Sequence, residues 1–88
     1  MMGTRLMPRY YFNLDDHLRE IDREGTVLSG PDEARVQAVM FAADYLSDNP
    51  KLVWDGRPFR VDVQDEAGTT LLNVVITASD PAKNRAAK

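Results

Sequence analysis

Pro31-Asp-Glu-Ala-Arg-Val-Gln-Ala-Val-Met-Phe-Ala-Ala-Asp-Tyr-Leu-Ser47 is the one segment of the chain with clear helical periodicity. At about 100° per residue, its small and apolar side chains collect on one face and most of its polar side chains on the opposite face. Pro31 suits the first helical turn, and Asn49-Pro50 ends the helix because the residue before a proline avoids helical geometry. The segment therefore predicts one helix whose inward face consists of Ala34, Ala38, Phe41, Ala42, Tyr45 and Leu46, with Val39 at its margin.

The composition of this helix suggests how it packs. Its alanines allow a close approach to a sheet, and Phe41 and Leu46 are expected to supply most of the buried area. Apolar residues continue through Val36, Met40 and Ala43, past half of the helix circumference. Such an excess indicates a second contact surface.

Segments typical of β-strands precede and follow the helix. Residues 9–14 and 59–64 alternate in polarity, whereas residues 70–77 are apolar on both faces. Shorter strands are expected near residues 18–21 and 26–28. Alternation places one set of side chains in the core, and that set is Tyr10, Phe12, Leu14, Phe59, Val61, Val63, Leu72, Val74 and Ile76.

Two turns share the pattern Asp-x-x-Gly-Thr, at residues 22–26 and 65–69. Aspartate and glycine are both typical of tight turns. We interpret the repeat as two uses of one hairpin-turn chemistry rather than as a duplicated domain. The order of strands, helix and hairpin predicts the α+β class: a small antiparallel sheet of three to four strands with one helix across one face.

One folded unit is expected over residues 8–78, between a flexible leader at 1–7 and a disordered basic tail at 79–88. A chain of 88 residues removes only about 60% of its unfolded surface from water, so association with a second copy would add stability.

The composition excludes several classes of function. The chain has no cysteine, which rules out disulfides, thiolate metal sites and cysteine nucleophiles. Its net charge of −3 argues against binding to nucleic acid or to an anionic membrane. No apolar run approaches the roughly 20 residues of a membrane span, and the first residues lack the apolar core of a signal peptide. The expected location is the cytoplasm.

Four segments occur in one order: the run Met7-Pro-Arg-Tyr-Tyr-Phe12, the turn Asp22-Arg-Glu-Gly-Thr26, the helix start Glu33-Ala-Arg35 and the hairpin Val61-Asp-Val-Gln-Asp-Glu-Ala-Gly68. In that order they resemble a family of small bacterial proteins, common in rhizobia-like proteobacteria, that is classed as a domain of unknown function. The resemblance covers about residues 7–78. It implies a compact α+β domain and a start near Met7, and it implies no activity, because none is established for the family.

The single histidine, His17, lies beside Asp15 and Asp16, and mixed histidine and carboxylate ligands can hold a divalent metal. A turn rich in aspartate is more often simply solvated, and that interpretation is favoured. Asp62 and Asp65 could form an acid–base pair, but they are interpreted as an outward strand residue and a turn former. The five glycines stand singly and form no phosphate loop. We therefore expect no catalytic residue and no cofactor.

The outer face of the sheet is expected to present Arg9, Tyr11 and Asn13 beside Arg60 and Gln64. Aromatic and arginine side chains together suit single-stranded nucleic acid. With one aromatic residue and an acidic chain, an ordinary solvated face is favoured.

The last strand, with Leu71 and Val75 on the face that the helix does not cover, motivates the leading hypothesis. It is a small non-catalytic binding module that self-associates as a dimer, by packing of outer sheet faces or by edge pairing, with a protein partner as a further candidate. Contiguous apolar surface usually marks a contact site. Trp54 is expected to close the end of the core, with a partner anchor as the alternative. An antitoxin-like nucleic-acid regulator and an unrecognised hydrolase remain open as alternatives. The candidate contact residues are Leu71, Val75, Tyr11, Arg9, Arg60, Val36, Met40 and Trp54.

Overall fold

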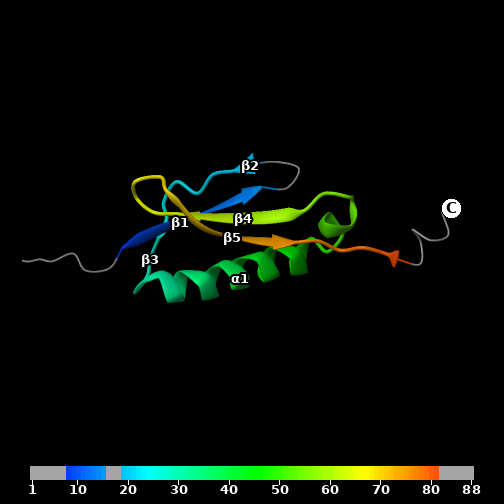
Figure 1. The fold of residues 1–88 in the computed structure, drawn as a ribbon, viewed down its shortest axis with the longest axis horizontal. Helices are drawn as coiled ribbons and strands as arrows, with labels where there is room; N and C mark the ends of the chain where they lie inside the picture. The colour runs from blue at the N-terminus through cyan, green and yellow to red at the C-terminus, as the bar shows by residue number, and fades with distance from the viewer. Residues whose placement is uncertain (1–7, 16–18, 82–88) are drawn as a thin grey trace, which may run out of the picture.

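The computed structural model describes residues 8–15 and 19–81, which form a helix packed against a five-stranded sheet (Figure 1). The predicted α+β class is confirmed. The sheet reaches five strands because two short segments each pair with the first strand over two residues. The predicted leader and residues 82–88 of the predicted tail lie outside the described residues. The elements are β1 (Arg9–Asp15), β2 (Arg19–Glu20), β3 (Thr26–Val27), α1 (Pro31–Asp48), the 3-10 helix η1 (Leu52–Trp54), β4 (Phe59–Gln64) and β5 (Thr70–Ile76).

All strand pairs in the sheet are antiparallel, in the order β2-β1-β4-β5, with β3 also beside β1. β4 is the central strand: it pairs with β1 from Gln64 to Arg60 and with β5 from Phe59 to Gln64, with a register shift between Val63 and Gln64 that leaves Leu71 of β5 unpaired with β4. β5 is therefore the outer strand on one side of the sheet. The opposite side is formed by the two-residue strands β2 and β3.

The outer edge of β1 is completed by a side chain. β3 pairs with the beginning of β1 and β2 with its end. Between them, Oδ2 of Asp22 accepts the N–H of Phe12 at 3.1 Å, and the N–H of Asp22 donates to Oδ1 of Asn13 at 2.9 Å. Asp22 thus takes the place of the strand residues that are missing at this point.

The two Asp-x-x-Gly-Thr turns use the same aspartate chemistry, but the prediction that both are hairpin turns is wrong for the first. Oδ1 of Asp22 accepts the N–H groups of Glu24 and Gly25, at 3.1 and 3.0 Å. In the second turn, Oδ1 of Asp65 accepts two N–H groups, from residues 67 and 69, at 2.9 and 3.0 Å. Only the second turn joins two strands that pair with each other, β4 and β5. The first connects β2 to β3, which both pair with β1.

The core lies between α1 and the sheet, and three alanines of α1 are its closest points of contact. Ala34, Ala38 and Ala42 are fully buried. The predicted inward side chains of β1 and β4 pack around them, with Phe59 and Leu14 among the largest fully buried side chains. The same face of β5 is half-buried, and Leu28 adds a buried residue after β3.

The larger side chains of α1 lie at the edges of this contact. Phe41 is 36% exposed and Leu46 is only partly buried, whereas the three alanines are fully buried. Alanine contacts bring the helix close to the sheet, and a long side chain then fits only beside the contact line. Phe41 accordingly packs against Phe12 at the β1 side, with ring centroids 6.3 Å apart.

Candidate interaction surface

β5 is an outer strand that lacks two common protections of a sheet edge. Among the described residues it pairs with β4 alone, with a register shift at Leu71. Its sequence, Thr-Leu-Leu-Asn-Val-Val-Ile, contains no proline and no charged residue, both of which block edge-to-edge pairing. On the sheet face away from α1, Leu71 is 45% exposed and Val75 54% exposed. The predicted exposure of these two residues is confirmed.

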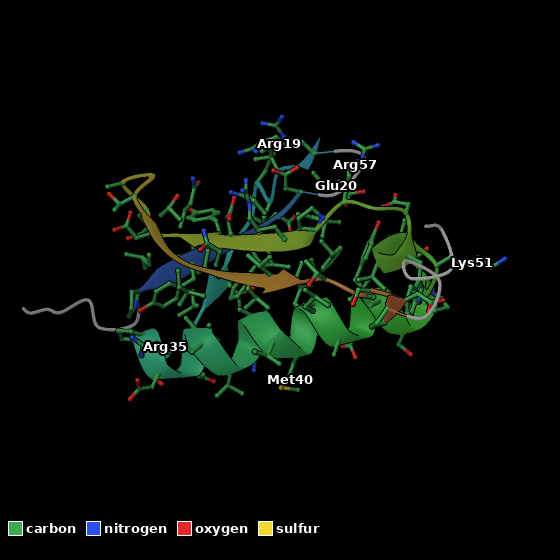
Figure 2. All side chains as sticks on the ribbon, turned by 45° about the vertical axis from the view of Figure 1, so that its right-hand side comes forward. Arg19, Glu20, Arg35, Met40, Lys51 and Arg57 are labelled. Atoms are coloured by element: carbon green, nitrogen blue, oxygen red, sulfur yellow. The ribbon has the colours of Figure 1, made fainter. Side chains whose placement is uncertain are left out.

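The exposed apolar residues of α1 do not join Leu71 and Val75. Val36 and Met40 lie on the side of the helix that faces away from the sheet, and Figure 2 shows Met40 pointing outward there. Leu71 and Val75 lie on the other face of the sheet. The structure therefore divides the predicted contact residues between two sides of the molecule.

Val39, which the sequence places at the margin of the inward face, is exposed. Phe41 packs on β1, which identifies the β1 side of the helix. Around the helix from Ala38, Phe41 lies about 60° towards β1 and Val39 about 100° in the opposite direction. Val39 is 55% exposed on this second flank of α1.

The open face of the sheet carries a hydrogen-bonded polar network rather than a plain solvated surface. Asn13 and Asp62 are opposite each other in β1 and β4, and both are buried, contrary to the prediction. Nδ2 of Asn13 donates to Oε1 of Gln64 at 3.1 Å, and Asp62 accepts from Nδ2 of Asn73 at 3.1 Å. Long neighbouring side chains cover these two short ones, so their burial needs no opposing layer.

The arginines of this face are engaged within the protein. Arg60 pairs with Asp15 at 2.7 Å and with Asp62 at 3.1 Å. Nη1 of Arg9 donates to the backbone carbonyl of Glu24 at 2.8 Å. Tyr11 lies against the Asp22 turn, where a Cβ on Gly25 would stand 2.8 Å from its ring. These contacts leave little of the basic and aromatic surface that single-stranded nucleic acid would need.

The two remaining candidates are separate from β5. Trp54, in η1, is 60% exposed, so the expectation that it closes the core is wrong and the anchor interpretation stays a prediction. His17 and Asp16 lie outside the described residues. Asp15, the third residue of the suggested metal site, pairs with Arg60 and, at 3.5 Å, with Arg19.

A family model described as a domain of unknown function (DUF6894) matches residues 9–77. No curated protein and no solved structure matches the chain. Within residues 8–15 and 19–81, no helix is long and apolar enough to cross a membrane.

Proposed function

The chain belongs to the DUF6894 family, whose function is unknown, and we propose that this member is a non-catalytic interaction module that self-associates through the edge of β5. In the proposed dimer, β5 pairs antiparallel with β5 of a second copy. The observation that carries the proposal is the outer edge of β5, which has no charged residue and no proline. The regulator and hydrolase alternatives are less favoured.

Self-association is favoured because, in an antiparallel arrangement, the edge of one strand can pair with the same edge of a second copy. A twofold axis brings identical backbone groups together in opposite directions, so every N–H of one edge meets a C=O of the other. Pairing centred on Asn73 spans all seven residues of β5, with the register shift at Leu71 near one end. It also brings Leu71 close to Val75 of the second copy, where two apolar side chains stabilise a strand pair.

The arrangement of the chain's own charges supports a binding role without catalysis. Of the two carboxylates considered for acid–base chemistry, Asp62 is tied to Arg60 and Asn73. Asp65 holds the β4–β5 turn through backbone N–H groups. The structural contacts of Asp62 and Asp65 therefore explain the presence of both carboxylates without a catalytic role.

Sedimentation velocity from low to high micromolar concentration tests the dimer. We expect the wild type to sediment as a dimer at high micromolar concentration. The double variant Leu71→Lys, Val75→Lys should be a monomer, because like charges then stand opposite each other across the edge. The matched control Val36→Lys, Met40→Lys adds the same charge on the outer side of α1 and should remain a dimer.

A charge-reversal experiment examines the pairing register. Leu71→Glu, Val75→Glu should also be a monomer alone, and an equimolar mixture with the double-lysine variant should restore the dimer, since each lysine then meets a glutamate. A wild type that stays monomeric at high micromolar concentration contradicts the proposal. Two charge variants that do not rescue each other contradict the register.

A further inference from the structure

A groove opens on the opposite side of the sheet from β5, between β1, the segment from Glu20 to Thr26 and the near flank of α1. Its volume is about 370 Å³. Its apolar walls are Phe12, Leu14, Ile21 and Phe41. The volume and apolar lining are typical of a site for a small molecule.

The groove follows from how the layers are offset. α1 packs over β4 and β5 and also contacts β1, where Phe41 lies against Phe12; Figure 1 shows β2 as the strand farthest from α1. On the side of β1 away from β4, the described residues place only the short strands β2 and β3 and the Asp22 turn. Among residues 8–15 and 19–81, no full strand therefore fills the space next to Phe41 on this side.

The groove is acidic. Glu20 and Asp22 are among its lining residues, and the lining residues that the structure describes include no lysine or arginine. The flank of α1 beside Gln37 also carries Glu33 and Asp44, which lie within about 40° of Gln37 around the helix. The three backbone N–H bonds to Asp22 keep its carboxylate ionised. An occupant of this groove therefore meets a negative field and two aromatic rings.

We propose that this groove binds a small organic cation, an ammonium or guanidinium group on an aromatic or aliphatic body. The body lies against Phe12, Phe41 and Ile21, where it removes exposed apolar surface from water. The cation lies beside Glu20, whose exposed carboxylate has no ion-pair partner among the described residues. The faces of the two phenyl rings attract a cation as well.

The charge of the ligand distinguishes a small organic cation from neutral and anionic molecules of the same shape. Phenethylammonium, phenethyl alcohol and hydrocinnamate present the same aromatic body with a positive, a neutral and a negative end. In NMR titrations at millimolar ligand, phenethylammonium should produce saturable shifts at Phe12, Ile21 and Phe41. The alcohol should bind more weakly, and hydrocinnamate should produce no saturable shift.

Substitutions at the groove, with one control elsewhere, test whether the ligand binds there. Glu20→Gln should weaken phenethylammonium binding by about fivefold, the effect of one carboxylate about 4 Å from the cation in water. Glu66→Gln makes the same charge change at the β4–β5 turn and should leave the affinity unchanged. Ile21→Ala removes one wall and should weaken all binding at the groove; Ile21 is largely exposed, so the fold is retained.

Several results would overturn the proposal: equal affinity for hydrocinnamate, equal losses in Glu20→Gln and Glu66→Gln, or shifts that map away from the groove. A basic peptide that binds at these residues while phenethylammonium does not would also overturn it. The groove and the β5 edge lie on different sides of the sheet, so this outcome is independent of the dimer.

Discussion

Asp22 supports the N-terminal half of the sheet through a single carboxylate. Burial by itself raises the pKa of Asp22, but the backbone N–H bonds from Gly25, Phe12 and Glu24 outweigh it, and the pKa lies below its ordinary value. A carboxylate with a lowered pKa in the folded state stabilises the fold while it is ionised. Its contribution is complete above the ordinary pKa and is lost as the pH falls through the lowered one.

Asp22→Asn should therefore reduce the free energy of unfolding by about 1–3 kcal/mol at neutral pH, because an amide leaves part of this hydrogen bonding unsatisfied. The difference from the wild type should narrow as the pH falls below the ordinary aspartate value of 3.8. Urea unfolding at a series of pH values measures both effects. Asp32→Asn, at an exposed ion pair, is the control and should change stability little. A difference that does not vary with pH would refute the role of the charge.

Gly25 and Gly68 occupy equivalent places in the two turns but different surroundings. Both have positive φ, 73° and 86°. A Cβ on Gly25 would stand 2.8 Å from side-chain atoms of Arg9 and Tyr11, whereas nothing lies within 4 Å of one on Gly68. Gly68→Ala should cost about 1–2 kcal/mol for its backbone conformation alone. Gly25→Ala should cost about 1–3 kcal/mol more, because neighbours must move. Equal costs by thermal unfolding would contradict this account.

At the scale of elements, the helix–sheet contact predicts unequal costs for two phenylalanines. Phe59 in β4 is fully buried, and its ring stacks on Tyr45 with centroids 5.6 Å apart. Phe59→Ala should reduce the free energy of unfolding by about 3–5 kcal/mol. Phe41→Ala should cost clearly less, since Phe41 keeps more than a third of its surface in water. Chemical denaturation compares the two, and equal losses would place Phe41 in the core after all.

The strands and the helix could be predicted from local patterns because each pattern indicates the face on which the side chains lie. Alternation in residues 59–64 places Val61 and Val63 on the core face, and the structure has them fully buried there. Periodicity likewise selects the alanine face of α1. The direction in which a side chain points does not determine how deeply it is buried, however. Phe41 points near the sheet yet lies at its edge, and Asn13 points away from α1 yet is buried.

The candidate surface was predictable only in part, for a related reason. The two-faced composition of β5 indicates exposed Leu71 and Val75, which the structure bears out. The position of β5 as an outer strand depends on which strands pair, and a local sequence pattern does not determine strand order. For the same reason, the sequence groups Val36 with Leu71, although the structure places them on different sides of the molecule. The groove depends on the offset of α1, which again is a property of the assembled layers.

At the scale of the whole molecule, the two long sides of the sheet have different characters. One side ends in β5, which is uncharged and seven residues long. The other side ends in β2, β3 and the Asp22 turn, with the acidic groove beside them. A dimer through β5 would leave the grooves of both copies facing solvent. The proposed assembly and the proposed ligand can therefore coexist.

The hydrogen bonds between Asp22 and β1 also limit the number of copies that the proposed assembly can contain. A sheet with two open edges can add molecules at both ends without limit, which leads to fibres. Here Asp22 already bonds the middle of the outer edge of β1, and two-residue strands occupy its ends. In the proposed assembly, each molecule therefore has one edge available for strand addition, that of β5, and growth would terminate at a dimer.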